Sequence, residues 1–225
     1  MATKKQDQDA MQQNVTEAAS KTEQFLDKNK NIIIGCLTAL LVIALCILCY
    51  TRFYLQPRKA KAASEMFHAE QAFAAGDYKL ALEGDDNYAG FEEIARRYGN
   101  KAGKSIYLYE GVSALRQGEF ETAIKALKKY SGKDAILAAR ALGCIGDAYV
   151  GLEKYPEAAA WFAKAAAKAD NMFAATYLLK EGACHEKLGD NDKALACYEV
   201  IKDKYPQSIE GTEIDKYINR IQFAK

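Results

Sequence analysis

Few side chains in this sequence have the chemistry of a catalytic or metal-binding group. The 225 residues include two histidines and six cysteines, and only Cys184 and His185 are adjacent members of the two types. A structural zinc ion needs four suitably spaced ligands, and no second Cys/His pair follows. The sequence therefore predicts no metal site. We expect His68 and His185 to pack between helices.

The cysteines fall into two groups of three. One group lies in an apolar stretch near the start of the chain: Cys36, Cys46 and Cys49. The other group lies in the polar remainder: Cys144, Cys184 and Cys197. Three cysteines cannot all pair with one another, so the chain is not a disulfide scaffold, and a reducing compartment is mildly favoured. A bridge between Cys184 and Cys197 stays open at this point.

The sequence gives little support for a phosphate-binding or nucleic-acid-binding site. Gly103, Lys104 and Ser105 lack the upstream glycines of a phosphate-binding loop. The 31 basic and 30 acidic residues are interleaved, which excludes a basic nucleic-acid footprint. Titratable groups are also too sparse to predict a convergent pocket. We expect a non-enzymatic protein with no catalytic residues, cofactor or small-molecule substrate.

The elements that position these side chains repeat along the chain. Ala123, Ala158 and Ala194 are spaced by 35 and 36 residues. Each has a glycine twelve residues before it and a large residue four after it; these pairs are Gly111 with Leu127, Gly146 with Phe162, and Gly182 with Tyr198. Small residues let two antiparallel helices touch, and large ones fill the space between pairs. Each block therefore predicts one helix pair.

This pattern resembles the tetratricopeptide repeat, in which glycine, alanine and an aromatic residue occupy the eighth, twentieth and about the twenty-fourth positions. Pro206 supplies the closing proline of the last block alone. An earlier, degenerate unit contains Ala81, and the turn-rich residues 84–90 interrupt its second helix. The resemblance implies an α-solenoid.

We predict an all-α chain: a single N-terminal transmembrane helix, an α-solenoid of about four tetratricopeptide helix pairs, and a C-terminal capping helix. The predicted segments are a polar tail (1–30), a transmembrane helix (31–54), a basic juxtamembrane linker (55–61) and a repeat domain (62–225). The units are expected at 62–98, 104–133, 139–168 and 175–206, with the cap at 210–223.

Residues 32–50 contain no charge over nineteen positions, enough to span about 30 Å of hydrocarbon as a helix. Aromatic and basic residues mark the expected membrane interface downstream: Tyr50, Arg52, Phe53, Tyr54, Arg58, Lys59 and Lys61. Pro57 is expected to end or kink the helix near Gln56. Basic residues on the two sides are nearly balanced, so charge alone does not set the orientation.

The tetratricopeptide resemblance also implies a concave groove lined by the first helix of each pair. The expected lining residues are Met66, Phe67, Glu70, Phe73, Leu108, Tyr109, Val112, Leu115, Arg140, Cys144, Asp147 and Lys180. Part of this strip can instead pack against the next unit. Met66 and Glu70 stand where the family's carboxylate-binding groove has Lys and Asn, which argues against that specialised use.

The order of parts, with FLDKNKN before one span, a basic linker and then the repeats, resembles the YfgM family of bacterial inner-membrane proteins. The resemblance implies a single-pass protein with a cytoplasmic N-terminus and a periplasmic repeat domain. It also implies protein partners, namely the SecYEG translocon and a PpiD-like periplasmic chaperone, beside membrane lipid. The expected role is to hold that chaperone or emerging clients during export. The alternatives are a cytosol-facing receptor or assembly scaffold, or a subunit of another membrane complex.

Overall fold

The computed structural model describes residues 28–169 and 171–223, in two compact units, Met1–Pro57 and Arg58–Lys225. Most of the predicted polar tail lies outside the described residues. Within the described ranges there is no strand, only an isolated antiparallel bridge between Gly84 and Ala89. The predicted all-α class is confirmed.

The apolar segment is helical. It belongs to a helical run, Lys28–Ala74, that is long and apolar enough to cross a membrane by length and composition. Most of its large apolar side chains between residues 32 and 48 are exposed. Such a surface requires a nonpolar surrounding or a partner to cover it.

Pro57 does not end this helix. The preceding turn widens into a π-helix, η1 (Tyr50–Leu55), and α2 (Gln56–Ala74) follows directly. The Gln56 N–H donates to the Thr51 carbonyl, five residues back. The expected break near Gln56 is replaced by this wider turn, since proline lacks an N–H and its ring crowds the turn before it.

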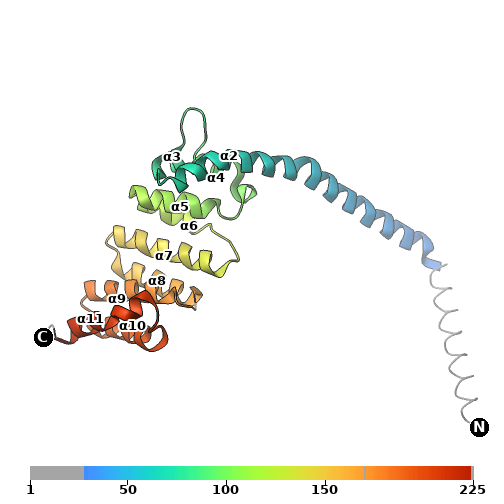
Figure 1. The fold of residues 1–225 in the computed structure, drawn as a ribbon. Helices are drawn as coiled ribbons and strands as arrows, with labels where there is room; N and C mark the ends of the chain where they lie inside the picture. The colour runs from blue at the N-terminus through green and yellow to red at the C-terminus, as the bar shows by residue number, and fades with distance from the viewer. Residues whose placement is uncertain (1–27, 170, 224–225) are drawn as a thin grey trace, which may run out of the picture. The chain divides into compact units, whose positions relative to one another are not determined.

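The second unit is a stack of helix pairs, with α5 to α11 following one another in layers (Figure 1). The pairs are α2 with α3 (Tyr78–Glu83) and α4 (Phe91–Tyr98), α5 (Ile106–Gln117) with α6 (Phe120–Leu127), α7 (Ala135–Gly151) with α8 (Tyr155–Ala169), and α9 (Ala174–Lys187) with α10 (Asn191–Lys204). A 3₁₀ turn, η2 (Gly99–Ala102), precedes α5, and α11 (Ile209–Phe223) follows the last pair. Four pairs and a cap are therefore present, as predicted.

Aspartates fix where several helices begin. Asp77, Asp134 and Asp190 precede α3, α7 and α10, and each carboxylate accepts a hydrogen bond from the backbone N–H three residues on, at 3.0, 2.8 and 3.3 Å. These bonds satisfy N–H groups that the first helical turn leaves unpaired.

The predicted small–large register is confirmed. Ala123, Ala158 and Ala194 are fully buried. A Cβ added to each repeat glycine would meet the large side chain of the following helix. The added atom would lie 2.4 Å from Leu127 at Gly111, 2.6 Å from Phe162 at Gly146 and 2.3 Å from Tyr198 at Gly182. All three distances are shorter than real Cβ contacts, so only glycine allows this approach.

The first unit departs from the register. Its second helix is split, because residues 84–90 form a loop in which the Asp85 carboxylate accepts from the Asn87 and Tyr88 N–H groups, both at 2.8 Å. Asp85 stands four residues after Ala81, where the other units have their large residue. Phe91 and Ile94 of α4 fill the core instead, and both are fully buried.

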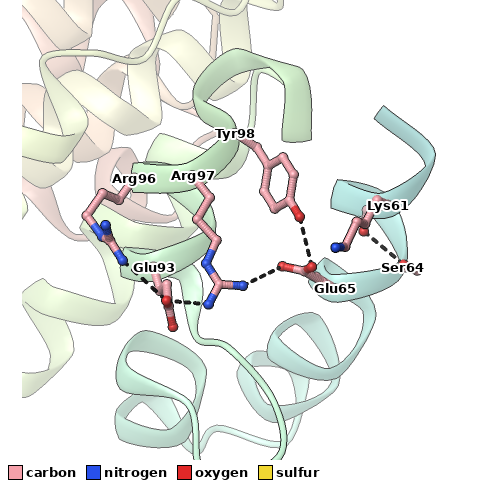
Figure 2. Close-up of polar contacts among 7 residues, drawn as sticks. All are labelled: Lys61, Ser64, Glu65, Glu93, Arg96, Arg97 and Tyr98. Carbon is pink, nitrogen blue, oxygen red and sulfur yellow. Dashed lines mark hydrogen bonds and ion pairs between the residues drawn. The ribbon is translucent and has the colours of Figure 1, made fainter. Parts of the chain in front are cut away.

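Polar contacts join α2 to α4 in this unit (Figure 2). The Glu65 carboxylate accepts from the Tyr98 hydroxyl at 2.8 Å and pairs with Arg97 at 3.4 Å. Arg97 also pairs with Glu93 on its own helix. Glu65 thus holds α2 against the end of α4, although exposed ion pairs of this kind add little stability.

The cap is tied to the last pair by apolar and polar contacts. Ile214, Ile218 and Ile221 are buried against it. Arg220 donates to Glu186 of α9 at 2.6 Å. Most exposed residues of α11 are polar, as expected for a terminal repeat, although Ile209 and Phe223 at its two ends are also exposed.

The register predicts that Gly146→Leu destabilises the array. The leucine would collide with the buried Phe162 ring, at a cost of about 1 to 3 kcal/mol or more. Thermal unfolding followed by circular dichroism measures this. Ala167→Leu, on the exposed face of α8, is the matched control and should leave the midpoint nearly unchanged. Equal midpoints for Gly146→Leu and the parent would contradict the register.

One ionisable group is buried in α5. Glu110 is 8% exposed, and its Oε2 has no hydrogen-bond partner within the described residues. Burial raises the pKa of this carboxyl to about 7, opposed by Lys129 and Lys125 and assisted by Glu92. The folded state therefore holds this proton more tightly than the unfolded chain does, so stability falls as the pH rises between the unfolded pKa and about 7.

Glu110→Gln is therefore expected to stabilise the protein at pH 8, by about 1 to 3 kcal/mol, because it removes the cost of a buried carboxylate. The gain over the parent should shrink to nearly nothing near pH 4.5, where both side chains are neutral. Denaturant titrations of both proteins across this range test the prediction. A gain independent of pH would show that Glu110 does not titrate in the folded state.

Candidate protein-binding groove

The inner helices α5, α7 and α9 enclose a hollow of about 650 Å³. Its size is within the range of pockets that hold ligands or peptide side chains. Six of the expected groove residues line it: Val112, Leu115, Arg140, Cys144, Asp147 and Lys180. These six residues come from the first helices of the second, third and fourth units.

The other predicted groove residues lie elsewhere. Met66 and Leu108 are buried in the core, at 4% and 8% exposure, because they face the second helix of their own or the neighbouring unit. The rings of Phe73 and Tyr109 pack on Phe91, at centroid distances of 6.1 and 5.1 Å. These four side chains serve packing.

Phe67 and Glu70 of α2 are exposed but lie outside the hollow. Phe67 meets the His68 ring edge-on, and His68 in turn stacks on Tyr88 at 3.6 Å between centroids. His68 therefore packs against the loop 84–90.

One ion pair crosses the hollow. Lys180 of α9 donates to both carboxylate oxygens of Asp147 on α7, at 2.7 and 2.9 Å. Its ammonium also lies 5.6 Å from the centroid of the Phe162 ring. Both charged groups are partly exposed, so the pair orients two helices more than it stabilises them.

Two guanidinium groups in the hollow have no carboxylate partner within the described part of the chain. Arg140 is exposed on α7. Arg116 is exposed at the end of α5, where its guanidinium lies 5.8 Å from the Tyr78 ring centroid. Because Asp147 already pairs with Lys180, the hollow carries a net excess of two positive charges. Such a surface favours acidic ligands.

Cys144 is the thiol among the lining residues. Burial, with the nearby Asp147 carboxylate, raises the pKa of its thiol to about 11. The thiol is therefore protonated at neutral pH and is a poor nucleophile. Burial also raises the pKa of the neighbouring Tyr177 hydroxyl. The hollow offers cationic and aromatic contacts for binding.

Several lining residues were not predicted from the sequence, notably Arg116, Phe173 and Tyr177. Helical spacing could have predicted two of them. Tyr177 precedes Lys180 by three residues and Arg116 follows Val112 by four, so each pair lies on one helix face. Phe173 lies before the start of α9, where helical periodicity carries no information.

The cysteines are free. Cys184 is buried beside Phe162, whereas Cys197 packs with the cluster formed by α9, α10 and α11, so the bridge left open above is not formed. Cys197 instead lies beside Glu181 and His185, a group whose ligand atoms could hold a metal ion.

A helical solenoid whose inner helices enclose such a hollow belongs to the class of protein–protein interaction scaffolds. A family model described as tetratricopeptide repeat matches residues 108–172 and again 145–209. This part of the chain is therefore built of tetratricopeptide repeats.

A solved structure supports the fold. "Crystal structure of MamA" aligns with a TM-score of 0.51 and 22% identity, over 68% of this chain and 92% of that one. Comparison with curated protein sequences finds no match.

Proposed function

We propose that this protein is a non-catalytic, membrane-tethered adaptor that binds segments of other proteins in the hollow between α5, α7 and α9. The observation that carries this proposal is a tetratricopeptide array whose hollow has two guanidinium groups without carboxylate partners in the described residues. Repeat arrays use such inner surfaces for extended or helical peptides.

The chemistry of the hollow favours an acidic segment that also carries an apolar residue. Arg116 and Arg140 offer charge-assisted hydrogen bonds to carboxylates. Ile136 and Phe173 are both 52% exposed beside them and offer apolar contact.

The proposed anchor is the apolar helix. Its exposed aliphatic surface suits lipid, and Tyr50 and Tyr54 stack at 5.2 Å near its end. Aromatic and basic side chains at this place are typical of the headgroup region, and the predicted interface set includes Arg52, Phe53, Arg58, Lys59 and Lys61. Tethering raises the effective concentration of the array toward neighbouring membrane proteins.

The resemblance to the YfgM family supports the finer proposal: an inner-membrane protein with its repeats in the periplasm, holding a PpiD-like chaperone or emerging chains beside SecYEG. A cytosol-facing receptor or scaffold is the second candidate. It is favoured by the three free thiols of the array, which suit a reducing compartment.

A reporter fused after Lys225 that is active in only one compartment separates the two orientations. The periplasmic proposal expects activity of a periplasmic reporter, and cytosolic activity would overturn it. Copurification in mild detergent then tests the partners. Recovery of neither translocon subunits nor a periplasmic chaperone would contradict the export role.

The hollow itself is tested by the double variant Arg116→Ala with Arg140→Ala. Loss of both guanidinium groups should weaken capture of the copurifying partner by about ten-fold or more and reduce its salt dependence. Lys154→Ala with Lys168→Ala removes the same charge at exposed positions outside the hollow and should leave capture unchanged. Equal capture by both double variants would show that the partner binds to a surface outside the hollow.

A further inference from the structure

The last repeat unit brings together three different metal-ligating side chains. Glu181 and His185 are four residues apart on α9, so they share one helix face. Cys197 reaches them from α10, the antiparallel partner helix. One ligand atom from each residue lies within 4.8 Å of the other two.

One nitrogen of the imidazole in this cluster lacks a hydrogen-bond partner within the described residues. His185 Nδ1 is buried, and within the described residues no protein group bonds to it. A buried nitrogen without a partner destabilises the folded state. A cation bound to this nitrogen would supply the missing partner.

We propose that Glu181, His185 and Cys197 bind one Zn²⁺ ion. Thiolate and imidazole ligands favour zinc over Mg²⁺ and Ca²⁺, which prefer oxygen. Three protein ligands leave the fourth tetrahedral position for water or for a side chain of a bound partner.

The geometry needs only a small adjustment. Zinc–ligand bonds of about 2.0 to 2.3 Å place tetrahedral ligand atoms roughly 3.5 Å apart. Side-chain rotations that move the ligand atoms by about 1 Å would bring the three groups to this separation. As the ion binds, the Cys197 thiol gives its proton to solvent and the thiolate forms the sulfur–zinc bond.

A bound ion would cross-link the two helices of the last unit, since its ligands come from both α9 and α10. Binding only to the folded chain would stabilise it. Cys184 is adjacent to His185 in sequence but is buried beside Phe162, so it is not part of the site and serves as a control.

The test uses the full chain in detergent, freed of metal by a chelator and dialysis. Calorimetric titration with Zn²⁺ should show one ion per chain, and Co²⁺ should give the absorption of a thiolate–metal bond. Cys197→Ser should remove that absorption and weaken Zn²⁺ binding by at least about 100-fold, because even outer-shell partners are worth about 10- to 100-fold. Cys184→Ser should retain both properties.

Absence of saturable Zn²⁺ binding would overturn the proposal, as would equal affinities of Cys197→Ser and the parent. Circular dichroism checks that the variants fold. Should Cys197→Ser fail to fold, His185→Gln and Glu181→Gln provide the same test. Zn²⁺ should also raise the melting temperature of the parent and of Cys184→Ser but not that of the ligand variants. This experiment needs no partner protein, so its result is independent of the adaptor proposal.

Discussion

The array depends on one steric constraint: a large side chain of each second helix lies directly against a glycine of the first. At Gly111, Gly146 and Gly182 even a methyl group would overlap the facing side chain. The contact brings the two helices close together and buries Leu127, Phe162 and Tyr198 almost completely. Because dense interiors tolerate little added volume, this contact sets the spacing of each pair.

The same constraint creates the groove. A first helix that turns its glycine toward its own partner leaves other faces for the neighbouring unit and for the concave side, where Arg140 and Asp147 of α7 project. The first unit lacks a glycine at this position, has Ala69 there, and completes its core with Phe91 from a split second helix. It contributes little to the hollow, which begins at α5.

The repeats made the fold predictable from the sequence. Residues of the same type as Gly146, Ala158 and Phe162 recur at fixed offsets in each of the last three units, and each offset has one steric meaning. The groove could be predicted from the sequence only in part. The resemblance to tetratricopeptide repeats placed Arg140, Asp147 and Lys180 on one surface. It did not show that Met66 and Leu108 face the core, since both faces of a repeat helix carry apolar residues. The π-turn before Pro57 depends on local hydrogen bonding, and the approach of Cys197 to His185 depends on the packing of two helices. Neither is encoded in residue spacing along one helix.

A double-mutant cycle between Gly146 and Phe162 tests the steric constraint, using Gly146→Ala, Phe162→Ala and the combined variant. Alanine is intrinsically better than glycine inside a helix by about 1 kcal/mol. Gly146→Ala should lower the free energy of unfolding when Phe162 is present and raise it once the ring has been removed. The same stabilising effect of Gly146→Ala in both backgrounds would show that the ring does not require the glycine, and would contradict the steric constraint.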